Sequence, residues 1–378
     1  MLDLNEEQQM ILETVRDLVN DKIKPRAQEL DNTGKFPQEN IDELIELGIV
    51  GMTVEEQYGG IGADMLTYAV VMEEISRGCA ATATTVAATN SLAIGPIQNF
   101  GSEELKQKFL PGFASGNLGA FALSEPQAGS DPANLKTRAE LDDDEWVING
   151  SKIYITNAIV ADTFVVFARS LDEPGSKGIS AFVVPGDAEG IHVMEPEKKL
   201  GIRASPTSAM TFENVRIPKE NLIGEEGKGL RYALTILDSG RIAVAAQAVG
   251  IAQAALDDSL KYAKEREQFG RPINRFQSIQ MMLADMDTQI QTARLLYYHA
   301  ANLKDSGQNY IKHAAQAKLY GSEIATDVTH KAIQVHGGSG FLKDYEVERY
   351  YRDARITEIY EGTSEIMRMV IARELLKE

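Results

Sequence analysis

The sequence predicts a multi-domain α and β chain: an all-helical N-terminal domain (1–117), a central antiparallel β-barrel or β-sandwich domain (118–228) and a C-terminal four-helix bundle (229–378). Apolar residues follow a helical spacing up to about residue 113 and again after 229. Between these regions, short β-branched and aromatic runs alternate with turn residues. With 378 residues, 43% of them apolar, the chain is long enough for two or three domains around separate cores.

The N-terminal region is expected to be helical from Asn5 onward. Ile11, Val15 and Leu18 recur at intervals of three and four residues, which places them on one face of the first helix. The glycine-rich turn YGGIGAD ends at Asp64, a residue type that caps helix N-termini. We therefore expect a further helix directly after Asp64.

The central region has the signals of a β-rich domain. The segment EWVINGSKIYIT alternates around Asn149 and Gly150, and such a pair is the strongest short signal for a β-hairpin. Three further runs, TFVVFARS, GISAFVVPGD and SAMTFENVRIP, are bounded by turn residues. This pattern predicts an antiparallel sheet with a hairpin turn at Asn149 and Gly150.

The C-terminal region returns to helical spacing. A long segment, LRYALTILDSGRIAVAAQAVGIAQAALDDSLKYAKER, reads as one helix, and two more begin near Phe276 and Tyr310. Long helices joined by short loops predict a four-helix bundle.

Charge and cysteine content exclude several classes of function. The net charge of −18 repels nucleic acid phosphates, so no nucleic acid partner is expected. The single cysteine, Cys79, permits no disulfide within the chain, which is typical of a reducing compartment. No apolar run reaches the roughly 18 residues of a membrane span, and MLDLNEEQQM lacks the features of an export signal. A cytoplasmic protein without membrane insertion is expected.

Common catalytic and nucleotide-binding motifs do not occur. GEEGKG lacks the hydroxyl residue of a phosphate-binding loop, and HGGSGF follows a helix instead of a strand. The five histidines show no metal-ligand spacing, and no nucleophile elbow is present. These patterns predict neither a metal site nor a serine nucleophile.

Five motifs together resemble those of the acyl-CoA dehydrogenase family. They are FALSEPQAGSD, KIYITNA, REQFGRPI, QVHGGSGF and IYEGTSEI, in that family's order and spread over the chain. Two other segments, NSLAIGPI (90–97) and ILDSGR (236–241), resemble most the short-chain, or butyryl-CoA, dehydrogenase group. The resemblance implies a flavoenzyme of fatty acid β-oxidation that converts a short acyl-CoA to a trans-2-enoyl-CoA. FAD would accept the β-hydride, a carboxylate would take the α-proton, and an electron-transfer flavoprotein would receive the electrons.

The resemblance implies that Glu361, in the motif IYEGTSEI, is the general base. Burial in an apolar pocket would raise the pKa of this carboxyl above its ordinary value of ~4.3 and strengthen it as a base. Tyr360 would wall the acyl pocket, and Gly362 would let the backbone approach the ligand. Some family members carry the base at the position of Gly240, where glycine cannot serve.

The remaining site residues also come from the resemblance. FAD would be bound by residues of three motifs: Phe121, Leu123, Ser124 and Ser130; Tyr154, Ile155 and Thr156; and Thr363, Ser364 and Glu365. Ser130, Asp238 and Arg241 would contact the acyl-CoA. Taken alone, SEPQAGSD is a turn segment, and Asp238 with Arg241 is nearly as typical of an ion pair on a helix.

A further group would reach FAD bound by a neighbouring subunit, which implies a homo-oligomer, usually a tetramer. Its members are Arg266, Phe269, Gln277, Gln334, Val335, His336, Gly337 and Gly338. Planar guanidinium groups suit phosphate, as expected for Arg266. Taken alone, Arg266 is more typical of a solvated helix face, and His336 of a packed histidine.

Other activities on the same fold stay open. An enoyl-CoA reductase would run the reaction backwards with a reduced flavoprotein, an acyl-CoA oxidase would pass electrons to oxygen, and a non-catalytic relative would only bind flavin. The sequence also leaves straight C4, branched and small cyclic acyl groups open, because one methylene discriminates by only ~1–3 kcal/mol.

Overall fold

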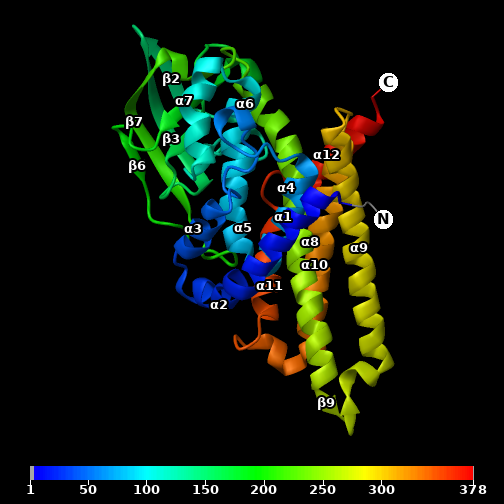
Figure 1. The fold of residues 1–378 in the computed structure, drawn as a ribbon. Helices are drawn as coiled ribbons and strands as arrows, with labels where there is room; N and C mark the ends of the chain where they lie inside the picture. The colour runs from blue at the N-terminus through cyan, green and yellow to red at the C-terminus, as the bar shows by residue number, and fades with distance from the viewer. Residues whose placement is uncertain (1–3, 378) are drawn as a thin grey trace.

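The computed structural model describes residues 4–377, in which a helical region, a β-sheet region and a second helical region follow one another along the chain. In space, the N-terminal helices lie between the sheet and the C-terminal bundle (Figure 1). Asp64 caps a helix as predicted: its side chain accepts a hydrogen bond from the Thr67 amide over 2.7 Å. The N-terminal helices are α1 (Glu6–Leu18), α2 (Lys24–Thr33), α3 (Gln38–Glu46), α4 (Met65–Gly78), α5 (Ala80–Ala87), α6 (Ile94–Phe100) and α7 (Glu103–Ala114).

The central region forms one eight-stranded sheet with the order β6-β7-β3-β2-β4-β5-β8, and β1 pairs with β4. Its strands are β1 (Gly119–Ala122), β2 (Arg138–Asp142), β3 (Glu145–Thr156), β4 (Thr163–Arg169), β5 (Ile179–Pro185), β6 (Ile191–Val193), β7 (Thr207–Pro218) and β8 (Leu222–Ile223). The predicted β domain is confirmed. Most neighbouring strands are antiparallel, but β1 and β2 each pair with β4 in parallel, which the sequence pattern does not predict.

The predicted hairpin turn at Asn149 and Gly150 is wrong. Both residues lie inside β3, at a shift of register against β7 between Ile148 and Gly150. The Asn149 side chain bridges to β7 by accepting from the Asn214 amide over 2.8 Å, so the polar pair marks a β-bulge. The chain turns earlier, between β2 and β3, where Asp143 has a left-handed φ of 55°.

The C-terminal region is built on three long helices, α8 (Gly229–Glu265), α9 (Gln277–Asp305) and α10 (Ile311–His336). A short ribbon of β9 (Glu267–Gln268) and β10 (Arg271–Pro272) joins α8 to α9 at the lower end of the bundle (Figure 1). The shorter helices α11 (Val347–Ala354) and α12 (Ser364–Leu375) both pack against α10.

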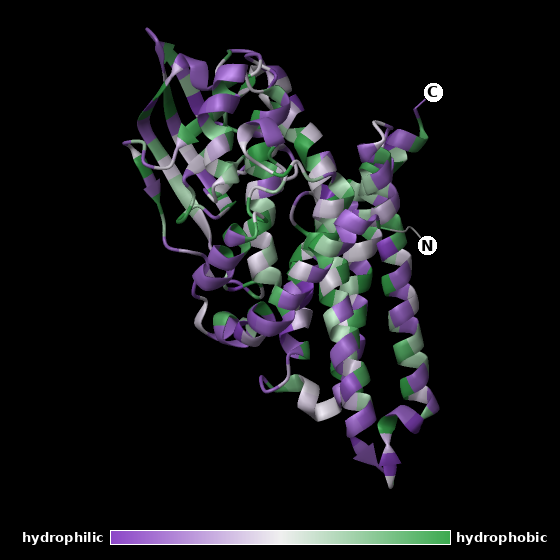
Figure 2. Ribbon diagram, viewed as in Figure 1, coloured by the Kyte–Doolittle hydropathy of each residue, from purple (hydrophilic) through white to green (hydrophobic). Residues whose placement is uncertain are grey.

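The two helical regions share one hydrophobic core, whereas another cluster of buried residues lies within the sheet region alone. Buried residues of α1, such as Val15, and of α4 belong to the same hydrophobic cluster as Ile242 of α8 and Met286 of α9. Figure 2 shows hydrophobic residues along α8, α9 and α10, whereas the β9 end is hydrophilic. By length and composition α8 could cross a membrane, but 72% of its most apolar window is buried inside the protein, as in the core helix of a globular fold. The limits 1–117, 118–228 and 229–378 stay a proposal.

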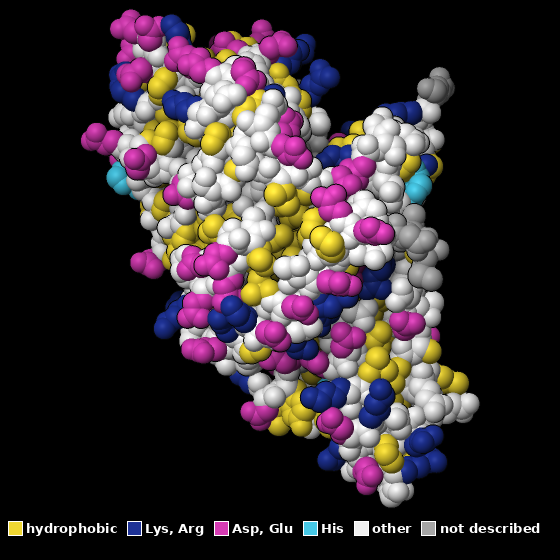
Figure 3. All heavy atoms as spheres, in the orientation of Figure 1, with side chains coloured by type: hydrophobic (Ala, Val, Ile, Leu, Met, Phe, Trp, Pro, Cys, Tyr) yellow, Lys and Arg dark blue, Asp and Glu magenta, His cyan; other side chains and the backbone are white. Residues whose placement is uncertain are grey.

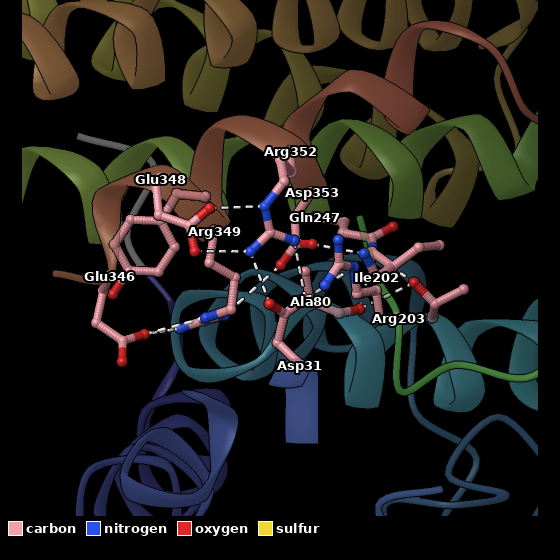
Figure 4. Close-up of polar contacts among 12 residues, drawn as sticks. Asp31, Ala80, Ile202, Arg203, Gln247, Glu346, Glu348, Arg349, Arg352 and Asp353 are labelled. Carbon is pink, nitrogen blue, oxygen red and sulfur yellow. Dashed lines mark hydrogen bonds and ion pairs between the residues drawn. The ribbon is translucent and has the colours of Figure 1, made fainter. Parts of the chain in front are cut away.

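A buried network of ion pairs joins the three regions (Figure 4). Arg352 of α11 donates to both carboxylate oxygens of Asp31 in α2, over 2.9 and 2.6 Å. Arg203, in the segment between β6 and β7, lies 4.0 Å from the same carboxylate. The Ile202 amide donates to Asp353 of α11, whose pKa burial raises to about 6. The helical regions and the sheet region are therefore held together by charged groups as well as apolar ones.

One face of the molecule carries acidic and basic side chains in a mixed arrangement (Figure 3). On the face drawn in Figure 3, lysine and arginine are interspersed with aspartate and glutamate, and hydrophobic side chains gather across the middle. This face has no extended basic patch of the kind that binds a phosphate backbone.

Candidate active site

Glu361 lies in a short loop between the 3₁₀ turn Arg355–Glu358 and α12. Its φ is 52°, in the left-handed region that residues with a Cβ rarely adopt. Gly362 follows with a φ of 104°, and a Cβ there would lie 2.7 Å from Cε of Met367. Two consecutive residues with positive φ turn the chain sharply, which explains why the helical pattern is interrupted at this motif.

The Glu361 carboxylate is buried and poorly solvated. Its Oε2 atom is inaccessible and has no hydrogen-bond partner within residues 4–377. Burial raises the pKa of Glu361 to about 7, although the positive charges of Lys318 and Arg241 oppose the shift. A carboxyl group with this pKa can exchange a proton near neutral pH.

Groups from α4 and α8 surround this carboxylate. A Cβ at Gly240 of α8 would overlap Glu361 Oε2, so the glycine provides the space that the carboxylate occupies. The next residue, Arg241, forms an ion pair with Asp238. On the α4 side, Tyr68 is buried, its hydroxyl lies 2.8 Å from Ser91 Oγ, and the Glu361 charge helps to raise its pKa. The predicted substrate residues Asp238, Arg241 and Gly362 thus lie beside the predicted base.

Two further side chains hold the loop itself. The Tyr360 hydroxyl donates to Gln247 Oε1. Gln247 Nε2 in turn donates to Thr84 Oγ1 over 2.8 Å and to Ala80 O over 3.1 Å (Figure 4). Lys318 of α10 is fully buried, and its Nζ donates to Gly362 O over 2.6 Å.

The first predicted flavin motif forms a loop after β1, held against β3 by a buried ion pair. Lys152 Nζ donates to Glu125 Oε1 over 2.7 Å, to Leu123 O over 3.2 Å and to Phe167 O over 2.7 Å. The Ile153 amide donates to Ser124 O over 3.0 Å. This clamp brings the predicted residues Leu123 and Ser124 beside the strand that carries Tyr154, Ile155 and Thr156.

Residues around Thr156 include polar groups without partners. Thr156 pairs in the sheet with Thr207, and Ile155 with Ser208. Asn157 Oδ1, Ser205 Oγ and Ser208 Oγ are all buried without a hydrogen-bond partner in the described part of the chain. Buried polar atoms are rarely left unsatisfied, so this cluster is suited to a polar ligand.

The other residues of these two motifs differ in exposure. Phe121 is half-buried, with its ring 4.7 Å from that of Phe167, and Ile155 is buried. Tyr154 is 68% exposed with a φ of 58°, and Ser130 is exposed.

Helix α5 connects the Thr156 cluster with the Glu361 cluster. Asn157 Nδ2 donates to Thr85 O over 3.0 Å, and the adjacent Thr84 accepts from Gln247. The two motifs predicted to meet at the reaction therefore contact the same short helix.

The N-terminus of α12 carries the last predicted flavin residues. Thr363 caps the helix by accepting from the Ile366 amide over 3.3 Å, and Glu365 is exposed. Ser364 Oγ is buried and has no partner among residues 4–377. Helix N-termini attract anions such as phosphate, so this end of α12 is suited to one.

The remaining predicted residues gather at the other end of the bundle. Val335 packs with Ala263 and Ile273, and His336 is buried with its ring stacked 4.3 Å from that of Tyr262. Phe269, near the β9 ribbon, is 93% exposed. Arg266, Gln277, Gln334, Gly337 and Gly338 are also exposed. Within one chain, the β9 end of the bundle lies away from α12 (Figure 1).

Sequence reasoning missed Lys318, Gln247 and Tyr68. A signal for Lys318 exists: it is a lone charge on an apolar helix stripe that contains Ala314, Gly321 and Ala325. Gln247 and Tyr68 offer no such signal, because their partners come from other helices.

Comparison with known proteins agrees with this architecture. The N-terminal, middle and C-terminal domains of acyl-CoA dehydrogenases match residues 5–117, 120–215 and 227–376. The chain is 47% identical over 376 residues to "Acyl-CoA dehydrogenase, short-chain specific" of Clostridium acetobutylicum, covering 99% of both chains.

Two solved structures share the whole fold. Butyryl-CoA dehydrogenase from Megasphaera elsdenii has a TM-score of 0.97 at 45% identity, covering 99% of each chain. A chain in the structure described as "Electron transferring flavoprotein of Acidaminococcus fermentans: Towards a mechanism of flavin-based electron bifurcation" has a TM-score of 0.98 at 46% identity, covering 100% of this chain and 99% of that one. The chain therefore belongs to the acyl-CoA dehydrogenase family of FAD-dependent oxidoreductases.

Proposed function

We propose that the protein oxidises a short-chain acyl-CoA to the trans-2-enoyl-CoA, with Glu361 as the base that removes the α-proton. The observation that carries the proposal is the buried Glu361 carboxylate, which has an unpartnered oxygen in the described structure and a pKa of about 7. A general base works best when its pKa lies near the operating pH. The similarity to short-chain and butyryl-CoA dehydrogenases supports a short acyl group.

The backbone beside the base is available to the substrate. Within residues 4–377 the Glu361 amide donates to no protein acceptor. We infer that it binds the thioester carbonyl and stabilises the enolate that develops when the α-proton leaves. Tyr360 and Gly362 would then line the acyl pocket, and Asp238 with Arg241 would lie near the thioester.

The chain's polar groups fit FAD. The unpartnered atoms of Asn157 and Ser208 lie beside Thr156, and those of Ser364 lie at the α12 N-terminus. We infer that the Leu123–Ser124 loop and Thr156 hold the flavin ring and that Thr363, Ser364 and Glu365 hold the phosphate end. When bound, the flavin supplies the hydride acceptor.

The exposed group at the β9 end supports a shared cofactor site. Arg266, at the end of α8, and Phe269, between β9 and β10, are exposed at the β9 end of the bundle, which lies away from α12 in the same chain (Figure 1). We infer that this group binds FAD held by a neighbouring subunit in a tetramer, as the family resemblance implies.

Arg266→Ala is expected to weaken FAD retention about 10- to 100-fold, the range of one charge-assisted hydrogen bond, and to loosen the oligomer as well. Flavin content after gel filtration and mass from light scattering would measure both effects. Lys264→Ala, also exposed near the end of α8, is the matched control. Unchanged flavin content and mass in Arg266→Ala would contradict the shared site.

Electron transfer to an electron-transfer flavoprotein and a cytoplasmic location stay proposals. The reverse reaction, reduction of an enoyl-CoA, would use the same residues with Glu361 protonated. A pKa of about 7 leaves both protonation forms populated near neutral pH. The similarity to a chain from a study of flavin-based electron bifurcation keeps this second function open.

An anaerobic visible spectrum of the purified protein before and after addition of butyryl-CoA tests the proposal. Bleaching of a bound flavin is the expected result. A bound flavin that stays oxidised with butyryl-CoA but bleaches with a branched or cyclic thioester would overturn the straight-chain assignment. A protein that takes up no FAD at all would overturn the dehydrogenase assignment.

A further inference from the structure

Lys318 is a buried cation without a close counter-ion. It has no exposed surface, and its neighbours along the same face of α10 are small, such as Ala314 and Gly321. Among the described residues no carboxylate forms an ion pair with its Nζ, whose only hydrogen-bond acceptor there is Gly362 O. Lysine is almost never fully buried unless it is paired, so this arrangement requires a reason.

The acceptor of this lysine belongs to the loop that carries the base. Glu361 has a left-handed backbone, a strained conformation that persists only where the surroundings hold it. On the C-terminal side, Lys318 holds the Gly362 carbonyl. On the N-terminal side, Gln247 accepts from Tyr360 and is itself anchored to Ala80 and Thr84. Both neighbours of Glu361 are thus fixed to helices.

We propose that Lys318 is a positioning residue for Glu361. Together with Gln247 it holds the loop in the left-handed conformation that directs the carboxylate into the space at Gly240, and its ammonium charge favours the ionised, basic form of the carboxyl. The inference rests on the proposed role of Glu361 as base, and it adds two residues that do not touch the reacting atoms.

Electrostatics support the same arrangement. The charges of Lys318 and Arg241 both lower the pKa of Glu361, against the larger effect of burial. Glu361, Glu358 and Glu365 in turn favour the charged form of Lys318, whereas burial and Arg241 oppose it, which leaves its pKa at about 8. Tyr68 and Tyr360 face the carboxylate as neutral groups, because burial raises the pKa of each.

Three variants separate charge from position. Lys318→Met removes the charge and the hydrogen bond at similar volume, and Lys318→Arg keeps the charge. Gln247→Leu removes the other anchor without any change of charge. Lys331→Met, on the same helix but in an i,i+4 ion pair with Asp327 at the surface, is the matched control.

The first measurement is the rate of butyryl-CoA oxidation by the FAD-loaded enzyme as a function of pH. For Lys318→Met we expect kcat to fall about 10- to 100-fold, the effect of a small misplacement of a reacting group, and the acidic limb of the profile to move to higher pH. Lys318→Arg should keep the wild-type limb, Gln247→Leu should lower kcat without moving the limb, and Lys331→Met should resemble the wild type. A wild-type rate and limb in Lys318→Met, or a wild-type rate in Gln247→Leu, would overturn the proposal.

The second measurement does not depend on turnover. Infrared titration reports the protonated Glu361 carboxyl through the band that Glu361→Gln lacks, and its midpoint should move to higher pH in Lys318→Met. This shift would support the proposal even if butyryl-CoA were not the substrate, so its failure and that of the proposed function are distinguishable. An unchanged midpoint would overturn it. If Lys318→Met does not fold, Gln247→Leu and Lys318→Arg still test the anchors and the charge.

Discussion

Glu361→Gln is expected to lose about 10²–10⁴ of the rate of acyl-CoA oxidation, the usual contribution of a positioned base. Glutamine has nearly the same shape as glutamate but cannot accept the α-proton. The variant should fold and retain FAD, because Glu361 is not among the predicted flavin residues and glutamine fits the same space. Stopped-flow measurement of flavin bleaching by butyryl-CoA gives the rate directly.

The control for this variant is Glu323→Gln, an α10 carboxylate at the surface that pairs with Arg368. It should keep the wild-type rate. If Glu361→Gln bleached its flavin as fast as the control, the base would have to be another residue.

The same carboxylate determines the expected pH dependence. Because its pKa is about 7, the rate should fall as the pH drops below 7 and level off above it, since only the ionised form is a base. An acidic limb near pH 4.5, the ordinary value for glutamate, would show that burial does not act on Glu361 in the working enzyme.

Lys152→Met is expected to cost about 3–5 kcal/mol of unfolding free energy, the range for removal of one partner of a buried ion pair. Lys152 is fully buried and Glu125 is 3% exposed, so the remaining carboxylate would lose its counter-ion inside the protein. The variant would also release the Leu123 carbonyl, so flavin content should fall together with stability. Urea unfolding and the flavin spectrum measure the two effects.

A surface ion pair on the same sheet provides the comparison. Arg216 of β7 bonds Asp142 over 2.6 Å and Glu145 over 3.0 Å, with half of its side chain exposed. Arg216→Met should cost less than about 1 kcal/mol. An equal loss of unfolding free energy in both variants would mean that burial does not determine how much the Lys152–Glu125 ion pair stabilises the protein.

The sequence predicted helices and caps well where they depend on interactions between residues close together in the chain. The Asp64 side chain caps α4 by accepting from the amide of Thr67, only three residues later in the chain. The spacing of Val15 and Leu18 likewise depends on one helix alone. The prediction at Asn149 and Gly150 was wrong because this pair lies at a β-bulge inside β3 and not at a turn. Only pairing with β7, more than 60 residues away, distinguishes the two.

The candidate site shows the same limit. Motif resemblance pointed to the Glu361 loop, but Lys318, Gln247 and Tyr68 come from three helices far apart in the chain. Their contacts arise from the packing of α4, α8 and α10, which no spacing within one segment encodes.

The Asp31 network has a consequence for how the molecule folds. Arg352 holds Asp31 across 321 residues of chain, and Arg203 reaches the same carboxylate from the β region. Opening any one region would strip a buried charge of its partner and expose the shared apolar core. We therefore expect the three regions to unfold together, in one transition, and not one after another.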